Sequence, residues 1–153
     1  MIQPKQDLVL QIKDILLADG DRATKGSQIC KVIRTRLDQK WVGIYDVHKS
    51  EYAVVAWSGP AAPAFFRFAG GKGLTAEAVT LRKTVVAGDV KSDPRYVSTH
   101  GNTQSEIIVP IISSARDTVV GTIDVQSERL HAFSKAHREL LEECAAALLP
   151  LWQ

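Results

Sequence analysis

Two apolar, β-branched runs around one short polar turn, between Ser105 and Ser127, constrain the fold of this chain most strongly. The first run is apolar at every position from Ile107 to Ile112. Runs of this length on either side of a turn predict a β-hairpin. A strand with one face in water would alternate apolar and polar residues, so the first strand is expected to be covered on both faces.

The second run of the hairpin is mixed in character. Strict alternation divides it into one face with Val119, Gly121, Ile123 and Val125, and another with Val120, Thr122, Asp124 and Gln126. A carboxylate inside a β-branched strand needs water or a polar partner. We therefore expect Glu106 and Asp124 to be pocket carboxylates that accept hydrogen bonds from a ligand ammonium or amide. The alternative is that they hold loop backbone N–H groups or face solvent.

The remaining elements follow from apolar spacing and turn residues. Helical spacing predicts helices over residues 4–18, 27–37, 75–82 and 134–152, with Ser27 and Ser134 as N-caps. Aromatic and β-branched runs predict strands over residues 41–47, 51–58, 65–68 and 84–90. Residues 91–102 have no apolar period, as is typical of a functional lid or wall. Short turns between consecutive strands predict an α+β fold, with an antiparallel sheet of about six strands flanked by N- and C-terminal helices.

Composition narrows the possible functions. A chain of 153 residues predicts one domain, residues 1–153, and a net charge of +2 argues against nucleic-acid and membrane partners. The chain has no apolar run of the roughly 20 residues that span a bilayer and no signal-peptide pattern, which predicts a cytoplasmic protein. Cys30 and Cys144 fall in separate predicted helices, which indicates reduced core thiols. Neither a metal site nor a cofactor is expected.

Several aromatic and loop residues are further candidates. Trp41 and Tyr45 are four apart on a predicted strand and share a face, so they form either an aromatic wall able to hold a cation or ordinary core. Arg95 and Tyr96 lie in the irregular stretch and could close over an anion. The glycine-rich residues 70–73 lack the spacing of a phosphate loop and are interpreted as a structural turn.

Short motifs occur in a characteristic order at residues 41–45, 58–60, 71–74, 89–90, 105–110 and 121–127. In this order and spacing they resemble the GAF domain, a PAS-related fold. Within that family they are most similar to the free methionine-(R)-sulfoxide reductases, which are single-domain GAF enzymes. The resemblance covers nearly the whole chain and implies that Glu106 and Asp124 line a ligand pocket.

The chain departs from that branch at the residues that carry its redox chemistry. The resemblance places cysteines where this sequence has Phe65, Thr75 and Thr99, and an aspartate where it has Gln126. Sulfoxide reduction needs one thiolate to attack sulfur and a second thiol to release it, and a threonine hydroxyl replaces neither. We therefore expect a non-catalytic binding or signalling module of the sensor type. The alternatives are a reductase-like enzyme and a structural dimerisation protein without a ligand.

The expected pocket lies between the sheet and the loop of residues 91–104. Its predicted ligand-binding residues are Trp41, Tyr45, Tyr96, Thr99, Glu106, Asp124 and Gln126. The ligand is expected to be a small polar molecule, and the sequence selects no single class. The terminal helices carry more apolar positions than one contact with a sheet requires, which predicts a homodimer through them.

Overall fold

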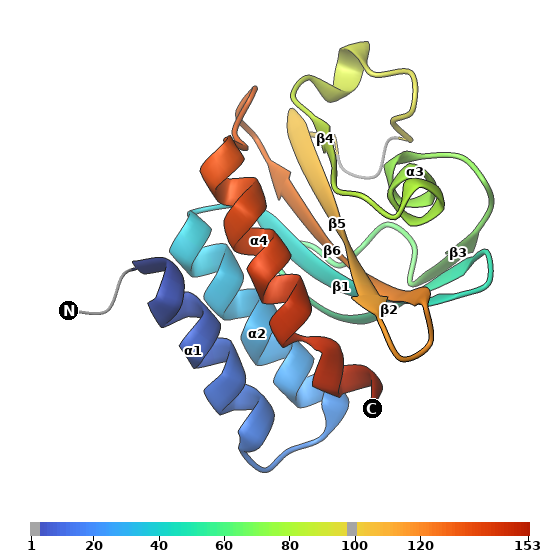
Figure 1. Cartoon of the computed structure of the whole chain (residues 1–153). Coiled ribbons are helices and arrows are strands. Elements are labelled where there is room, and N and C mark those ends of the chain that lie inside the picture. The colour runs from blue at the N-terminus through green and yellow to red at the C-terminus, as the bar shows by residue number, and fades with distance from the viewer. Residues whose placement is uncertain (1–3, 98–100) are drawn as a thin grey trace.

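The computed structural model describes residues 4–97 and 101–153 and contains one antiparallel sheet in the order β3-β2-β1-β6-β5-β4 (Figure 1). The strands are β1 (Trp41–His48), β2 (Glu51–Ser58), β3 (Arg67–Ala69), β4 (Val85–Ala87), β5 (Ser105–Ser113) and β6 (Thr118–Ser127). The β5–β6 hairpin that the sequence predicts is confirmed, and both its strands are buried along nearly their whole length. The hairpin therefore forms the centre of the fold.

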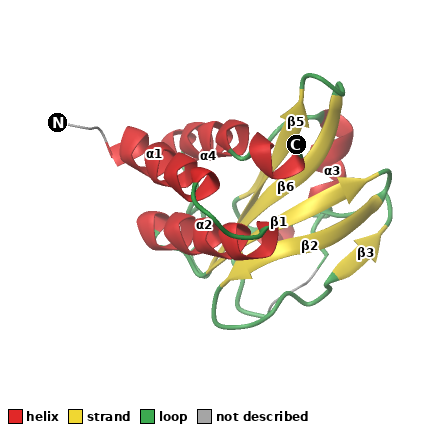
Figure 2. Cartoon of the chain, turned by 90° about the horizontal axis from the view of Figure 1, so that it is seen from below, coloured by secondary structure: helices red, strands yellow, loops and turns green. Residues whose placement is uncertain are grey.

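The helices divide unequally between the two faces of the sheet. They are α1 (Pro4–Leu17), α2 (Arg22–Leu37), α3 (Leu74–Leu81) and α4 (Lys135–Ala147), with short 3-10 turns η1 (Val90–Ser92) and η2 (Leu149–Trp152). Figure 2 shows α1, α2 and α4 together on one side of the sheet and α3 on the other. This arrangement is the predicted α+β GAF fold, with N- and C-terminal helices against a six-stranded sheet.

The ends of two helices differ from the prediction. Helix α2 begins at Arg22, not near Ser27, because the Asp21 side chain caps it by accepting a hydrogen bond from the Thr24 N–H at 2.7 Å. The last helix begins after its predicted cap, Ser134, but ends at Ala147 and continues as η2. A proline at position 150 lacks the N–H that would extend the α-helix.

The edge strands are shorter than the sequence indicates. The predicted strand over 65–68 is shifted to β3, and the one over 84–90 is reduced to β4 before the chain turns into η1. Both strands lie at the two edges of the sheet, where each has only one neighbour to supply ladder hydrogen bonds. The chain leaves the sheet early at these edges, and the loops that follow become walls of a cavity.

A β-bulge at the start of β6 places Val120 on the other face of the sheet from the one predicted. The β5–β6 register shifts between Ile111 and Ile112, so that Ile112 pairs with Val119 and Ile111 with Gly121. Val120 is the extra residue of this bulge, and it packs with Ile123 in the cluster on the helical face. Beyond the bulge the alternation is as predicted.

The main core lies between the sheet and helices α1, α2 and α4. It contains fully buried side chains from all three helices and from the central strands, among them Ile12, Ile33, Ile44, Ile123 and Leu141. Removing such a side chain from water contributes about 1.5–3 kcal/mol each. On the opposite face, a second and smaller cluster forms between α3, β4 and β5 around Leu74, Ala78 and Ile108. The smaller cluster does not cover the whole face, and the uncovered part holds the candidate site.

Candidate functional site

A cavity of about 530 Å³ opens on the face of the sheet that carries α3. Its floor is formed by side chains of β1, β5 and β6, and its walls by the segment that precedes β3, the turn before α3 and the segment after η1. Of the residues predicted from sequence, the cavity is lined by Tyr45, Tyr96, Glu106, Asp124 and Gln126. Residues 70–73, predicted as a structural turn, contribute to the wall as well.

The polar groups of the floor come from two neighbouring strands in fixed register. Glu106 of β5 lies opposite Gln126 of β6, and Ile108 lies opposite Asp124. Glu106 is therefore diagonal to Asp124, a distance that long side chains can span. The two carboxyl-bearing residues are only 5% and 7% exposed.

Burial and mutual repulsion change the ionisation of this pair. Burial raises the pKa of Glu106 well above its ordinary value, and the charge of Asp124 raises it further. A protonated Glu106 also donates a hydrogen bond to Asp124, which favours the protonated form, whereas a hydrogen bond from Gln126 opposes it. Burial and the neighbouring carboxyl therefore both make the proton of Glu106 harder to remove than that of an exposed glutamate.

Thr103, which the sequence analysis did not single out, orients Gln126, the third polar side chain of the floor. The Thr103 hydroxyl donates to the Gln126 side-chain oxygen at 2.9 Å, and both residues are buried. The Gln126 amide nitrogen is thereby turned toward the carboxyls, 3.5 Å from an Asp124 oxygen. Thr103 and Gln126 are 23 positions apart, so only the pairing of the strands brings them together. The sequence contained no local signal for this contact.

Aromatic rings form the apolar side of the cavity. Tyr45 packs edge-on against Phe68 with ring centroids 5.7 Å apart, and Phe68 also contacts Tyr52 at 5.0 Å. Burial raises the pKa of the Tyr45 hydroxyl, and the charges of Asp124 and Glu106 raise it further, so Tyr45 stays neutral. The ring wall therefore presents π faces and an uncharged hydroxyl to a ligand.

Of the two places predicted for Trp41, the structure matches the core position and not the cavity wall. It is on the same face as Tyr45, but it is only 1% exposed and is not among the residues that line the cavity. Its indole N–H donates to the Ala61 carbonyl at 3.0 Å. Its ring lies over Gly43, where an added Cβ would come within 2.3 Å of the ring. Trp41 thus supports the wall from behind and anchors the segment of chain that follows β2.

The segment around Tyr96 only partly matches its prediction. The Tyr96 hydroxyl oxygen is buried and has no hydrogen-bond partner among the described residues, which leaves it available to a polar ligand atom. The sequence allowed Arg95 to close over an anion, but Arg95 does not line the cavity, and its guanidinium is held by Asp93 at 2.7 Å. Thr99 lies outside the described residues.

The resemblance implies cysteines at the positions of Phe65, Thr75 and Thr99, and the first two of these positions lie at this cavity. Phe65 and Thr75 both line it, and neither offers a thiol. The two cysteines of the chain, Cys30 and Cys144, are free and buried in the cluster on the opposite face of the sheet. Burial raises the pKa of both thiols, that of Cys144 to about 12, and the charge of Glu143 adds to the Cys144 effect. Both thiols are protonated near neutral pH and remote from the cavity.

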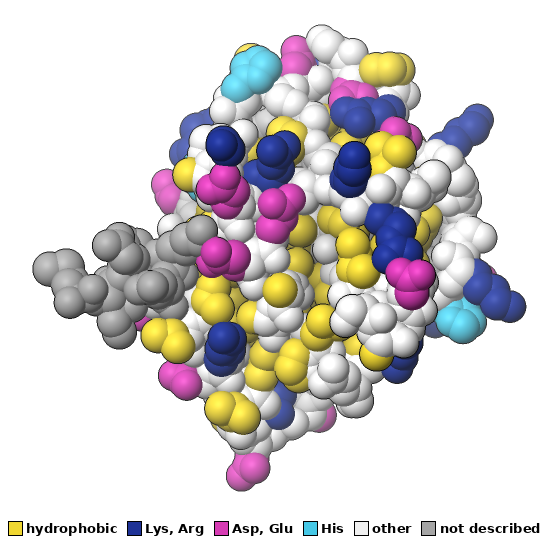
Figure 3. All heavy atoms as spheres, viewed as in Figure 1, with side chains coloured by type: hydrophobic (Ala, Val, Ile, Leu, Met, Phe, Trp, Pro, Cys, Tyr) yellow, Lys and Arg dark blue, Asp and Glu magenta, His cyan; other side chains and the backbone are white. Residues whose placement is uncertain are grey.

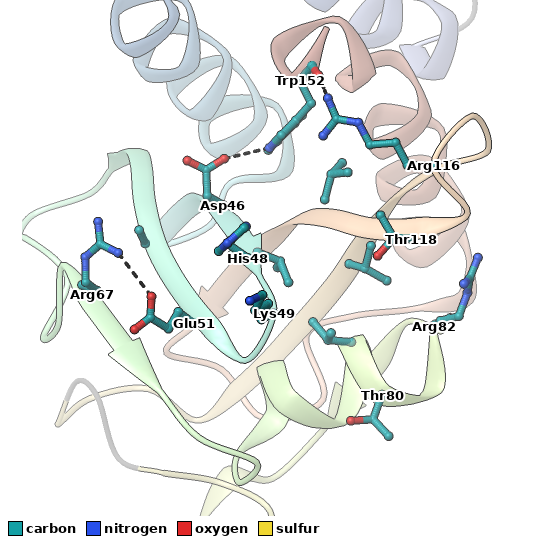
Figure 4. Close-up of a pocket in the computed structure, with 15 residues that line it drawn as sticks. Asp46, His48, Lys49, Glu51, Arg67, Thr80, Arg82, Arg116, Thr118 and Trp152 are labelled. Carbon is teal, nitrogen blue, oxygen red and sulfur yellow. Dashed lines mark hydrogen bonds and ion pairs between the residues drawn. The ribbon is translucent and has the colours of Figure 1, made fainter.

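A second hollow, of about 620 Å³, lies where the β1–β2 and β5–β6 turns meet α3 and η2 (Figure 4). Its charged side chains are largely paired. Asp46 accepts hydrogen bonds from the Trp152 indole at 2.7 Å and from Arg22 at 2.6 and 2.9 Å, and Glu51 lies 3.7 Å from Arg67. The Arg22 guanidinium also stacks 5.0 Å from the Trp152 ring centroid. These contacts join α2, β1 and η2, so we interpret this hollow as structural.

Within residues 4–97 and 101–153, no group of three or more histidine, cysteine or acidic side chains is placed to hold a metal ion. Among the helices in that part of the chain, none combines the length and the apolar character that crossing a membrane requires.

Comparison with known proteins places these features in a family. A family model for the GAF domain matches residues 24–148. GAF domain-containing protein A of Dictyostelium discoideum is 24% identical over 139 residues, which cover 90% of this chain and 85% of that protein. Free methionine-R-sulfoxide reductase of Saccharomyces cerevisiae is 32% identical over 112 residues, 71% of this chain but only 61% of the yeast protein.

The fold is similar to that of a solved reductase. The structure of free methionine-R-sulfoxide reductase from Neisseria meningitidis in complex with its substrate superposes with a TM-score of 0.86 at 27% identity, covering 97% of this chain and 87% of that one. The sequence match covers most of the chain, and it includes the strands that carry the carboxyl pair. This chain therefore belongs to the GAF domain family.

Proposed function

We propose that this GAF domain is a non-redox binding module for a small molecule that carries an ammonium or amide N–H group. The observation that carries the proposal is the pair of buried carboxyls, Glu106 and Asp124, that opens into a cavity with aromatic walls. A carboxylate in this buried place is poorly solvated, so it attracts a cationic or N–H-donating ligand group more strongly than an exposed carboxylate would.

The walls of the cavity support a ligand with an apolar part. Tyr45 and Phe68 offer ring faces to a cation or an apolar chain, and the Tyr96 hydroxyl can bond one further polar atom. The cavity volume of about 530 Å³ is within the range of small-molecule sites in proteins. The described side chains leave this space open, which favours a binding role over a purely structural one.

Thermal unfolding against a panel of small amines, amides and the matching alcohols tests the proposal. A ligand present at 100 times its Kd raises the apparent stability by about 2.7 kcal/mol, because it binds only the folded state. We expect stabilisation by amines or amides in the wild-type protein and its loss in the Asp124→Asn variant. Equal stabilisation of both proteins, or of neither by any member of the panel, would contradict the proposal.

The named relatives favour one second candidate, a reductase-like enzyme. The test is NADPH consumption with thioredoxin, thioredoxin reductase and free methionine sulfoxide. Because Phe65 and Thr75 offer no thiol to attack sulfur, we expect the rate with this protein to equal the rate without it. Turnover above that control would establish the enzyme, and its loss in a Cys30→Ser or Cys144→Ser variant would identify the thiol used.

We also propose that the module is a homodimer through its terminal helices. Leu10 and Leu17 of α1 are 45% and 85% exposed, and Figure 3 shows hydrophobic side chains over the lower part of the face that α1 and α4 form. Size-exclusion chromatography with light scattering should give the molar mass of a dimer for the wild type. The Leu10→Glu/Leu17→Glu variant should give that of a monomer. The Leu130→Glu variant is the control, since Leu130 is exposed outside these helices. A monomeric wild-type protein would reject this part of the proposal.

A further inference from the structure

The floor of the cavity carries a charge that the chain itself fixes. Glu106 and Asp124 are buried together on neighbouring strands, so ionising both would place two like charges close together out of contact with solvent. The third polar side chain, Gln126, is uncharged and 1% exposed. The geometry of the floor therefore favours a single negative charge over two.

Thr103 decides which end of the Gln126 amide meets the carboxyls. Its hydroxyl donates to the amide oxygen at 2.9 Å, so the amide nitrogen points toward Glu106 and Asp124 as a donor. With the opposite orientation, the amide oxygen would face the carboxylate oxygens and repel them. Both Thr103 and Gln126 are buried, so water cannot readily replace this hydrogen bond.

The rest of the cavity offers little to a second ligand charge. Its walls are largely apolar and include Phe65, Phe68, Leu74 and Val97. Besides the two carboxyls, the charged side chain among the described lining residues is Lys72, which is exposed at the turn before α3. A second positive charge on the ligand would lie either against apolar walls or beside this lysine, and both places are unfavourable.

We propose that this pocket selects a singly charged organic amine with an uncharged, largely apolar body, and that Thr103 is a positioning residue for this selectivity through the Gln126 amide. The inference rests on the proposed binding function. The ligand ammonium pairs with the one ionised carboxyl while the other carboxyl stays protonated, and no covalent bond changes in the protein or the ligand.

Calorimetric titration with three probes of similar size tests the ligand class. The probes are 2-phenylethylamine, 2-phenylethanol and 4-(aminomethyl)phenethylamine, which carry one, no and two positive charges. We expect the monoamine to bind at least about tenfold more tightly than either of the others, because one unmatched charge or one lost ion pair costs about that factor. If the diamine or the alcohol binds as tightly as the monoamine, the inference is overturned while the binding function stands. If none of the probes binds, the inference fails, and the amine and amide panel decides separately whether the binding function fails with it.

Two variants test the part played by Thr103 and Gln126. Gln126→Glu has the same shape but replaces the donor with a third carboxyl, so the preference for monoamine over diamine should fall about tenfold. Thr103→Val releases the amide and should weaken monoamine binding several-fold with little effect on the alcohol. The matched control is Thr122→Val, the same change at a buried residue that does not line the cavity. An unchanged preference in Gln126→Glu, or equal effects of the two threonine variants, would overturn the assignment.

Discussion

The two faces of the central sheet use the same strands for opposite purposes. On the helical face, Ile123 and Val125 of β6 are completely buried among apolar side chains of the helices. On the α3 face, Asp124 and Gln126 of the same strand line an open cavity. The side chains of a strand alternate between its faces, so four consecutive residues supply both the core and the site. Apolar burial on the helical face therefore stabilises the fold, whereas the α3 face carries polar groups that repel each other.

The largest expected difference between the faces concerns stability. The Ile123→Ala variant removes a fully buried side chain from the main core and should lower the free energy of unfolding by about 2–5 kcal/mol. The neighbouring Asp124→Asn variant relieves repulsion with Glu106 and should cost less than about 1 kcal/mol or stabilise the protein. Urea unfolding of the wild type and both variants measures these changes in the free energy of unfolding. A cost for Asp124→Asn as large as that for Ile123→Ala would remove the distinction between the faces.

A second difference should appear in the dependence of stability on pH. Because the pKa of Glu106 is raised in the folded protein, the native state keeps a proton that the unfolded chain loses above the ordinary glutamate range. The free energy of unfolding should therefore fall as pH rises from about 4.3 through the folded pKa of Glu106, with a slope of at most about 1.4 kcal/mol per pH unit. The Glu106→Gln variant should lack this fall.

Other carboxyls act in a different pH window and serve as an internal control. The pKa of Asp93 is lowered by its hydrogen bond and ion pair with Arg95, which outweigh the effect of burial. Its stabilising contribution is present above the ordinary aspartate range and is lost only at lower pH. If wild type and Glu106→Gln show the same profile above about pH 4.3, the paired carboxyls of the cavity do not share a proton.

The smallest expected effect concerns a hydroxyl on the α3 face. Thr122 is fully buried, and its hydroxyl oxygen has no hydrogen-bond partner among the described residues. Thr122→Val keeps the shape and removes the unpaired group, so we expect a gain of about 1 kcal/mol in the free energy of unfolding. The same change at Thr103, whose hydroxyl is bonded, should instead destabilise the protein by about 1 kcal/mol. Equal effects at both sites would mean that hydrogen bonding does not distinguish them.

The sequence predicted the parts of the fold that depend on local pattern. The hairpin and the sheet class follow from alternation and turn residues, whereas the family resemblance implied that Glu106 and Asp124 line one pocket. The bulge at Val120 and the cap of α2 at Asp21 were missed or misplaced, because each depends on a local geometry that several residues could satisfy. Alternation alone therefore gives the faces of β6 beyond the bulge but not the face of Val120 itself.

The candidate site was predictable to a similar extent. Tyr45, Tyr96, Glu106, Asp124 and Gln126 line the cavity as expected. The position of Trp41 was not predictable, because sharing a strand face with Tyr45 does not determine whether the loop after β2 covers the ring. The hydrogen bond from Thr103 to Gln126 depends on both the strand register and the path of the loop before β5. No local sequence pattern predicts it.

The most direct test of the account is the unfolding of the Glu106→Gln/Asp124→Asn double variant with and without 2-phenylethylamine. Without the amine, the account predicts that the variant is at least as stable as the wild type. With the amine, we expect that only the wild type gains stability, by an amount that rises with the logarithm of the ligand concentration above Kd. A variant that unfolds several kcal/mol more easily without ligand, or that the amine stabilises as much as the wild type, would contradict the claim that this buried pair exists to bind a cation.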